Sequence, residues 1–384
     1  MKPAAVVLSC AMLGAPAAAQ DRRSVSEPRI PAVCRTLDAA LAHAGQPGDA
    51  APDTARIQSA IDACSAGSAV ELRAANGRSI FVSGPIELRR GVTLLVSSGA
   101  VLAASINPRE YDTRPGACGT VDDRGTGCRP FIHAGDAPDA AIVGEGAIDG
   151  RGGERLVGQP DSWWDLAQQA KVKHAHQNVP RLIVADRADN FVLYRITLRN
   201  SPNFHVYVGH TNGFTAWGVR IDAPKTARNT DGIDPSSSTN VTIVHSFIRV
   251  GDDNVAIKAG ANGPATHMTI AHNHFYSGHG MSIGSETNGG VRAIAVEDLT
   301  IDGADNGLRI KSNATRGGRV EQVVYRDVCI RGVKNPIVLD REYDGVKTVG
   351  LVPRYEDVRY EDVRVGETAP SSCAARFVPF PERP

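Results

Sequence analysis

Short apolar segments recur at nearly regular intervals through the middle of this 384-residue chain, and this repeat limits the possible folds more than any other feature. The intervals between successive segments are 23, 27, 27, 26 and 29 residues. The segments begin at Phe191, Phe214, Val241, Met268, Ile294 and Val323. A turn and a second short strand follow, as at Val255-Ala256-Ile257. Short strands that repeat every ~20 to 50 residues are typical of a solenoid.

Among solenoids, a parallel β-helix fits the pattern best. A leucine-rich repeat needs regular Leu and Asn positions, which the chain lacks, and a propeller needs about four strands in each repeat. A β-helix has open ends that must be covered against edge pairing. A short helix capped by Asp53 or Thr54 carries Ile57, Ile61 and Cys64 on one face and is a natural N-terminal lid. Strand patterns resume soon after it, so we predict a single all-β domain over residues 20–384.

The first 19 residues have the pattern of a secretory signal peptide. Lys2 gives a positive start, residues 4–13 are apolar, and Ala17-Ala18-Ala19 precedes Gln20 as a small-residue cleavage site. The apolar run is too short to span a bilayer, and no later segment of the sequence qualifies. We therefore predict a secreted protein, extracellular or periplasmic, without a membrane partner.

Six cysteines remain once residues 1–19 are removed. An even number in an exported chain predicts disulfides. One pair encloses a Gly- and Asp-rich loop, another flanks the expected N-terminal helix, and two cysteines are left for each other. The spacing thus favours Cys34 with Cys64, Cys118 with Cys128, and Cys329 with Cys373. A zinc site is the rival interpretation, but the chain has no Cys-x-x-Cys.

The net charge is zero, because 42 basic side chains balance 42 acidic ones. Such a chain has no general attraction to nucleic acid or to membranes. Any preference for an anionic ligand must therefore come from local charge.

Four short motifs fall at the same position of successive repeats and hold most of the reactive side chains. They are Asn229–Gly232, Gly251–Asp253, Gly278–Gly280 and Arg309–Lys311. Aligning the apolar residues of the second strands places three acids, a histidine and two cations on one surface. Neighbouring strands lie roughly 4.8 Å apart, so these side chains are expected to be close together.

The predicted row of side chains suits acid and base catalysis. In the aligned register Asp231 lies beside Asp253, and Asp253 shares a row with His279 and Asn306. Adjacent acids raise one another's proton affinity, because like charges resist joint ionisation. One acid is then expected to stay protonated near neutral pH while the others remain carboxylates, as cleavage of a glycosidic bond requires.

Each motif also has an ordinary structural explanation. Asn-Thr-Asp-Gly and Gly-Asp-Asp are common turn sequences. His279 can tolerate an unusual backbone between glycines, and Arg309 and Lys311 can form a solvated face. Their common register makes a functional site the better interpretation. Trp163-Trp164 has two equally good explanations, a sugar-stacking platform and a packed loop anchor.

With these motifs in this order and spacing, the chain resembles glycoside hydrolase family 28, and within it the bacterial polygalacturonases. The resemblance covers nearly all of residues 20–384. It extends over 146–152, 162–164, 201–205, 229–235, 251–258, 278–286 and 306–312. It implies a right-handed parallel β-helix that hydrolyses α-1,4 bonds of polygalacturonate, the acidic polysaccharide of pectin. Inversion of configuration, without a metal or other cofactor, is also implied.

The resemblance assigns roles to the acids. Asp252 resembles the general acid that protonates the leaving oxygen. Asp231 and Asp253 resemble the carboxylates that activate water. His279 resembles the residue that hydrogen-bonds the acid and tunes it.

Four further residues resemble contacts of the family's substrate. Arg309 and Lys311 resemble the cations that bind the sugar carboxylate beside the cleaved bond. Asn229 resembles a residue next to the catalytic cluster, and Tyr343 resembles a substrate-contacting tyrosine. The tail after Tyr360 departs from the family pattern, which leaves the C-terminal end of the β-helix undetermined.

The expected stereochemistry involves a conflict. The aligned register places the acids near each other, and a separation of about 5 Å is associated with retention, whereas the family implies inversion. We expect inversion, because two carboxylates can hold one water jointly without the wider gap.

Other functions remain open at the level of the sequence. We expect an endo-acting monomer, because no large insertion blocks the motifs. An exo-polygalacturonase or a rhamnogalacturonan hydrolase has the same core. A pectate lyase would use the acids as calcium ligands, and a non-catalytic carbohydrate-binding β-helix would only bind the sugar.

Overall fold

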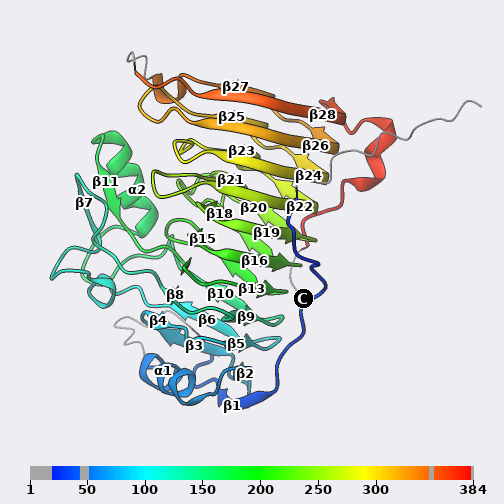
Figure 1. Ribbon diagram of the computed structural model, residues 1–384. Helices are drawn as coiled ribbons and strands as arrows, with labels where there is room; N and C mark the ends of the chain where they lie inside the picture. Colours follow the sequence, from blue (N-terminus) through cyan, green and yellow to red (C-terminus); the bar gives the residue numbers. More distant parts are fainter. Residues whose placement is uncertain (1–19, 44–51, 346–349, 382–384) are drawn as a thin grey trace, which may run out of the picture.

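The computed structural model describes residues 20–43, 52–345 and 350–381, so the expected signal peptide lies outside the described residues. The chain winds into a right-handed parallel β-helix, as predicted, with its coils stacked one above another (Figure 1). Of the described helices, none is long and apolar enough to cross a membrane.

One side of the coil is a nine-stranded parallel sheet, which carries the four motifs. Its strands, from the N-terminal end, are β4 (Ile86–Glu87), β8 (Ile132–Gly135), β12 (Ile183–Asp186), β15 (Val206–Gly209), β18 (Ile233–Ser236), β21 (Val255–Ile257), β23 (Met281–Ile283), β25 (Asn306–Lys311) and β27 (Asn335–Asp340).

The remaining sides belong to a 17-stranded sheet that bends around the coil. Its strands are β1 (Val33–Asp38), β2 (Ser68–Arg73), β3 (Ile80–Ser83), β5 (Val92–Val96), β6 (Val101–Ala104), β9 (Ala141–Val143), β10 (Ala147–Asp149), β13 (Phe191–Tyr194), β14 (Thr197–Arg199), β16 (Asn212–Trp217), β17 (Arg220–Asp222), β19 (Thr239–Val244), β20 (Phe247–Arg249), β22 (Ala265–Tyr276), β24 (Val291–Asp302), β26 (Arg319–Arg331) and β28 (Arg354–Gly366). In the last four coils one strand replaces two, since β22 pairs with both β19 and β20.

The core is a set of apolar columns running along the coil axis. In the nine-stranded sheet one column joins Ile183, Val206, Ile233, Val255, Met281 and Leu308, all fully buried. Because successive residues of a strand point to opposite faces, the residue after each of these faces outward. The repeat read from the sequence is therefore the periodicity of this core.

A short helix covers the N-terminal end, as predicted. Helix α1 (Thr54–Ala63) buries Ile57 and Ile61 against the first coil. The predicted capping is wrong in detail, because Asp53 precedes the helix without a side-chain capping bond. Its carboxylate instead accepts a hydrogen bond from the backbone N–H of Val82 at 2.7 Å. That bond fixes the helix to β3.

Residues 20–32, here called the N-terminal strap, run along the outside of the 17-stranded sheet before β1 begins (Figure 1). The backbone N–H of Asp21 donates to the hydroxyl of Thr269 on β22 at 3.0 Å. Farther along, the hydroxyl of Tyr194 on β13 donates to Glu27 at 2.7 Å. The strap therefore bridges coils that are well separated in the sequence.

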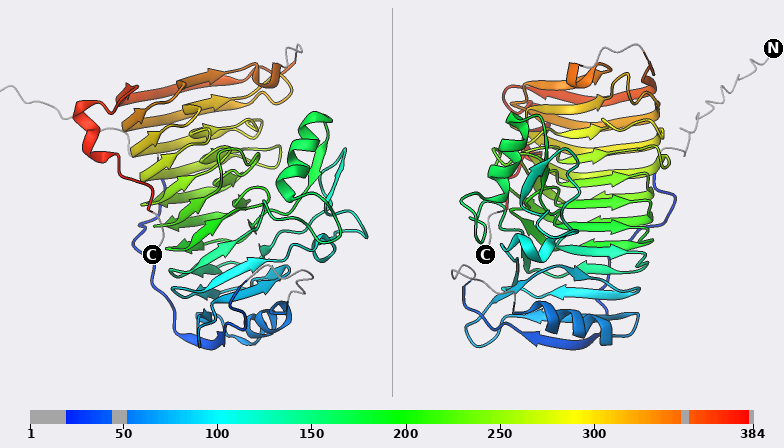
Figure 2. Two further views of the ribbon diagram at one scale, coloured as in Figure 1. Left: turned by 180° about the vertical axis from the view of Figure 1, so that it is seen from behind. Right: turned by 90° about the vertical axis from the view of Figure 1, so that its left-hand side faces the viewer.

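The C-terminal tail, which the sequence left undetermined, turns back along the outside of the coil (Figure 2). Its 3₁₀ turn, Ser371–Arg376, is followed by Phe380, whose ring lies edge-on to Tyr276 at 5.3 Å. Ile337 and Leu339 on β27 stay exposed. The tail thus covers a side wall and leaves the outer surface of the last coil in solvent.

A small lobe stands beside the nine-stranded sheet (Figure 1). It consists of helix α2 (Trp163–Val172) and the antiparallel pair β7 (Thr120–Asp122) and β11 (His176–Asn178). Trp163 is fully buried, edge-on to Tyr111 at 5.9 Å, and Trp164 donates to the carbonyl of Ser201 at 2.9 Å. Of the two explanations for these tryptophans, the structure supports the packed anchor.

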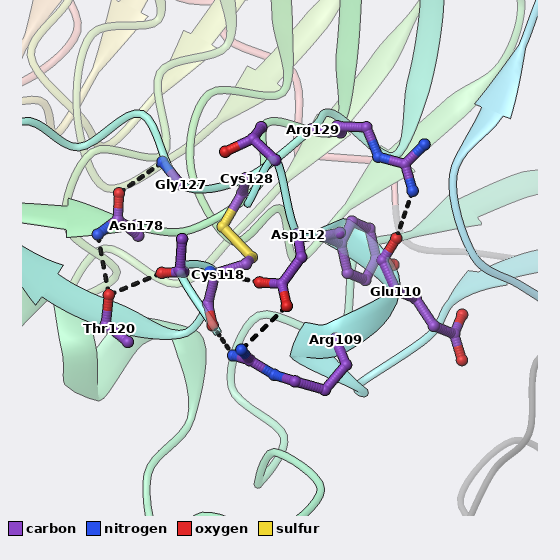
Figure 3. The surroundings of a disulfide bond; sticks show 12 residues. Arg109, Glu110, Asp112, Cys118, Thr120, Gly127, Cys128, Arg129 and Asn178 are labelled. Carbon is purple, nitrogen blue, oxygen red and sulfur yellow. Dashed lines mark hydrogen bonds and ion pairs between the residues drawn. A yellow bond between two sulfur atoms is a disulfide. The ribbon is translucent and has the colours of Figure 1, made fainter. Parts of the chain in front are cut away.

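The three disulfides have the pairing that the spacing favoured: Cys34–Cys64, Cys118–Cys128 and Cys329–Cys373. Figure 3 shows the Cys118–Cys128 bond at the base of the lobe. Next to it, Asn178 of β11 accepts from the N–H of Gly127 at 2.7 Å and donates to the hydroxyl of Thr120 at 3.0 Å. The disulfide and Asn178 together fix β11 in place.

Candidate active site

The four motifs meet on the outward face of the nine-stranded sheet. Ile233, Val255, Met281 and Leu308 are successive register partners on β18, β21, β23 and β25. This is the register expected from the sequence. Asp231, Asp253 and His279 lie two residues before Ile233, Val255 and Met281, respectively. They therefore occupy equivalent positions in successive coils and form one row along the coil axis. We call this outward face the site face.

Asp252 and His279 form the most accessible pair on the site face. Nδ1 of His279 lies 3.0 Å from Oδ1 of Asp252. The Asp252 side chain is 18 % exposed, whereas those of Asp231 and Asp253 are 4 % and 2 % exposed. Asn229 donates to the other oxygen of Asp252 at 3.5 Å. Asp252 is therefore the acid that a ligand on the face can reach most easily.

The lobe supports this pair from the side. Gln177 of β11 donates to the side-chain oxygen of Asn229 at 3.0 Å. Asn229 has a positive φ of 56°, a conformation that asparagine adopts more readily than most residues. The lobe, its disulfide and the turn sequence therefore combine to present the Asn229 amide to Asp252.

Asp253 is surrounded by donors. Lys311 donates to its Oδ2 at 2.8 Å, and Ser282 donates to its Oδ1 at 2.8 Å. The guanidinium of Arg309 also donates to Oδ1 and, through Nε, to the Ser282 hydroxyl at 3.1 Å. Both oxygens of this buried carboxylate are thus occupied.

Asp231, one strand away, has a different environment. Its Oδ2 is 3.4 Å from the ammonium of Lys258, which lies closer to Asp234, at 2.6 Å. Asp234 is fully buried, and one oxygen of each acid has no hydrogen-bond partner among the described residues. Two acids thus share one cation, and Asp231 keeps an oxygen free to accept a proton.

These surroundings push the pKa values of the two acids near Lys258 upward. Burial raises the pKa of Asp231 well above its ordinary value, and the charges of Asp234 and Asp252 raise it further, against a smaller lowering by Lys258. Burial likewise raises the pKa of Asp234 to about 6, although Lys258 opposes it. Asp231 therefore binds a proton more tightly than an ordinary aspartate does.

The other two acids shift the opposite way. Burial acts to raise the pKa of Asp253, but the charges of Lys311 and Arg309 outweigh it and hold the pKa well below the ordinary value. Burial also acts to raise the pKa of Asp252, but the hydrogen bond from His279 and the charges of His279 and Lys311 together outweigh it and lower the pKa. Among the three predicted acids, the one with the raised pKa is Asp231 and not Asp252, the residue that resembles the general acid.

Glycines let the motif turns pack this closely. Gly280 follows His279 with a φ of 73°, and a Cβ there would overlap the carbonyl oxygens of Asn306 and Gly307 on the next coil. A Cβ at Gly251 would likewise overlap the carbonyl oxygen of Ala227. The structural explanation of these glycines is therefore correct, and it is compatible with the site because the same close packing brings the acids together.

Arg309, Lys311 and Tyr343 lie together at the C-terminal side of the acids. The Lys311 ammonium is 4.9 Å from the centre of the Tyr343 ring. Burial raises the pKa of Tyr343, so its phenol is neutral at physiological pH. Both cations bind Asp253 in the unliganded protein, and a second anion on the site face would meet them at the same place.

Asp252, Asp253 and His279 have donor atoms within 4.8 Å of one another, a spacing that a metal ion could use. The bonding around Asp253 disfavours a cation there, because Arg309 and Lys311 already neutralise it. A metal ion would have to displace two buried positive charges. The donor set therefore fits calcium poorly.

The sequence did not predict the role of Asp234 or its bond to Lys258. Period-two alternation could have found Asp234, because it follows the inward residue Ile233 and so faces outward. Which of several acids a lysine contacts depends on side-chain conformation, and this the repeat does not encode.

Comparisons with known proteins identify relatives over most of the chain. The model of the glycosyl hydrolases family 28 matches residues 114–376. An endo-polygalacturonase of Pectobacterium carotovorum subsp. carotovorum is 46% identical over 360 residues, which are 93% of this chain and 87% of the relative. A polygalacturonase of Ralstonia solanacearum is 44% identical, over 87% of this chain and 72% of the relative.

A solved structure supports the same relationship. The polygalacturonase from Erwinia carotovora ssp. carotovora superposes with a TM-score of 0.84 at 42% identity. The superposition covers 90% of this chain and 96% of that one. The family match over residues 114–376 spans all four motifs of the site face.

Proposed function

The chain belongs to glycosyl hydrolase family 28, and from this and the site face we propose that it hydrolyses the α-1,4 bonds of polygalacturonate, the acidic polysaccharide of pectin. The observation that carries the proposal is the row formed by Asp231, Asp253 and His279, with Asp252 and two cations beside it. Proton-transferring acids next to carboxylate-binding cations suit a uronic acid polymer, although the protein has no net charge.

In the proposed mechanism Asp252 protonates the leaving oxygen. It is the most exposed of the three acids and is hydrogen-bonded to His279. Its pKa is low in the unliganded protein, but a bound uronate adds negative charge and expels water. Both effects disfavour the carboxylate, so we expect substrate binding to raise the pKa of Asp252. His279 and Asp252 would then share the proton that is transferred.

Asp231 is the better candidate for the base that activates water. It has an oxygen without a partner, whereas both oxygens of Asp253 are occupied. A base must accept a proton, and a raised pKa gives it the affinity to do so. In this scheme Asp253 mainly orients Arg309 and Lys311 and contributes its charge to the water site.

We test the proposal first with Asp252→Asn, which removes the proton donor and keeps the shape. Turnover of polygalacturonate should fall by about 10² to 10⁴, while binding measured by calorimetry persists, since proton donation acts in the transition state. Asp222→Asn, which changes an acid bonded to Arg249 on the far wall, is the matched control. Unchanged turnover in Asp252→Asn would show that this site is not catalytic. The alternative of a purely carbohydrate-binding β-helix predicts that outcome.

The mode of cleavage is proposed to be endo. Two similar bacterial proteins are named endo-polygalacturonases. An endo-acting enzyme lowers the viscosity of polygalacturonate early, before many reducing ends appear. Slow loss of viscosity with abundant monomer would instead identify an exo-acting enzyme.

We further propose that the reaction inverts the anomeric configuration. Proton NMR of the first product should then show the β-anomer before mutarotation, and initial retention would contradict the proposal. A lyase would give a product that absorbs in the ultraviolet and would lose activity with a chelator. Full activity in a chelator with no such absorbance excludes that alternative.

The protein is also proposed to be a secreted monomer. Three disulfides support an oxidising compartment. N-terminal sequencing of the exported protein should begin at Gln20, and light scattering should give the mass of one chain. Recovery of the protein with residues 1–19 attached in the cytoplasm would contradict the first part.

A further inference from the structure

Arg181 lies in the same row as the catalytic acids, two strands toward the N-terminus. It precedes Ile183 by two residues, as Asp231 precedes Ile233, and Ile183, Val206 and Ile233 are successive register partners. Strands lie roughly 4.8 Å apart, so Arg181 is about 10 Å from the row position of Asp231. It faces the same solvent as the acids and is half-buried.

The Arg181 guanidinium lies over two aromatic rings, those of Phe204 and Tyr207, which we call the aromatic shelf. It lies 4.9 Å from the centre of the Phe204 ring and 4.5 Å from that of Tyr207. The Tyr207 ring extends across Gly209, where an added Cβ would be 2.9 Å from a ring carbon. A side chain at that position would displace the ring. Gly209 therefore leaves room for the Tyr207 ring, and the rings of Phe204 and Tyr207 hold the guanidinium over the site face.

Arg181 has no ion-pair partner among the residues that the structure describes. The charge of Arg181 lowers the pKa of Asp234, but Asp234 is already bonded to Lys258 at 2.6 Å. Lys258 also lies 4.2 Å from the centre of the same Phe204 ring. Arg181 and Lys258 thus both contact the Phe204 ring, and Arg181 has no carboxylate partner among the described residues. Such a guanidinium can bind an incoming carboxylate through two parallel hydrogen bonds.

We propose that Arg181, on the shelf of Phe204 and Tyr207, binds the carboxylate of a substrate sugar on the opposite side of the acids from Arg309 and Lys311. This rests on the proposed function, since polygalacturonate carries a carboxylate on every residue. A polymer running along the site face then meets cations on both sides of the bond to be cleaved. The shelf offers its rings to the apolar face of a sugar.

The test compares Arg181→Gln with Arg181→Lys on defined oligogalacturonides of increasing length. Loss of one charge-assisted contact should raise KM about tenfold for oligomers long enough to reach the shelf. Oligomers too short to reach it should keep their KM, and kcat on long oligomers should change little. Arg181→Lys should restore part of the loss, because it keeps the charge without the paired geometry.

A matched control is available on another wall of the coil. Arg195 also lies over a tyrosine ring, that of Tyr194, at 5.3 Å, but it lies between β13 and β14 of the 17-stranded sheet. Arg195→Gln should leave the KM of every oligomer unchanged. An equal rise of KM for short and long oligomers in Arg181→Gln, or no rise at all, would overturn the proposal.

A binding experiment separates this proposal from the proposed function. Calorimetry of a long oligogalacturonide with Asp252→Asn and with the double variant Asp252→Asn/Arg181→Gln needs no turnover. About tenfold weaker binding of the double variant supports the subsite even if the unmodified protein does not hydrolyse polygalacturonate. Equal binding of the two variants counts against the subsite even if hydrolysis is observed.

Discussion

Asp231 and Asp253 occupy equivalent positions just before neighbouring strands, yet their pKa values are shifted in opposite directions. Asp253 accepts from Ser282, Arg309 and Lys311, and its pKa is well below the ordinary value. Asp231 shares the cation Lys258 with a second acid, and its pKa is well above the ordinary value.

The difference lies in the ratio of positive to negative neighbours and not in depth, since both side chains are almost fully buried. A buried carboxylate with two cations stays ionised, whereas two buried carboxylates with one cation retain a proton. A repeating fold can therefore place identical residues in identical backbone positions and still give them different chemistry, because the neighbouring strands supply different partners.

The largest expected effect comes from Asp253→Asn. It would leave Arg309 and Lys311 buried without their carboxylate, and loss of one member of a buried ion pair costs about 3 to 5 kcal/mol. The free energy of unfolding, measured with urea at pH 7, should fall by that amount, and turnover should be lost with it.

The same variant has a distinct pH dependence. Because the folded pKa of Asp253 is depressed, its stabilisation is present above the unfolded pKa of about 4 and is lost as the pH falls. The stability gap between Asp253→Asn and the unmodified protein should therefore narrow below about pH 4. A gap that stays constant down to pH 3 would show that charge is not its origin.

Asp231→Asn should separate stability from activity. Below the unfolded pKa of about 4, Asp231 is protonated in both the folded and the unfolded protein, so a neutral amide should there change the free energy of unfolding by less than about 1 kcal/mol. Turnover should fall by about 10² to 10⁴, because the base is missing. The folded pKa is raised, so the unmodified protein loses stability as the pH rises from the unfolded pKa of about 4 up to the folded pKa. The variant should therefore gain stability relative to the unmodified protein over that pH range, and a loss there would contradict the assignment.

The partners of Asp231 should move the acid limb of the pH–activity profile in opposite directions. The base must be deprotonated, so activity falls as the pH drops through the pKa of Asp231. Asp234→Asn removes a negative neighbour and should shift the limb of kcat/KM to lower pH by about one unit. Lys258→Gln removes the cation and should shift it to higher pH. Parallel shifts in both variants would rule out Asp231 as the base, and thermal melting checks that both fold.

The smallest expected effect is that of Ser282→Ala. Its hydroxyl accepts from Arg309 and donates to Asp253, but Lys311 and Arg309 still hold that carboxylate without it. The free energy of unfolding should fall by about 1 kcal/mol, with turnover changed less than tenfold. A loss as large as that of Asp253→Asn would mean that the hydroxyl, and not the cations, maintains the low pKa of Asp253.

The sequence predicted those parts of the molecule that follow the repeat. The column from Ile233 to Leu308 has period-two alternation and constant spacing, so both the strand register and the row of Asp231, Asp253 and His279 could be derived from it. The bond between Lys258 and Asp234 could not, because a flexible side chain chooses among several nearby acids. The course of the tail beside Tyr276 was equally out of reach, because it depends on contacts that occur once and have no period.

The N-terminal strap has a consequence for how the chain folds. In a solenoid each coil contacts its neighbours, so the coils can form in sequence order. Asp21, however, bonds to Thr269, 248 positions later. The first residues of the strap therefore have no docking site until about two-thirds of the coils exist. Contacts of such long separation in sequence slow folding. We therefore expect the backbone amides of the N-terminal strap to be the last to become protected from hydrogen exchange.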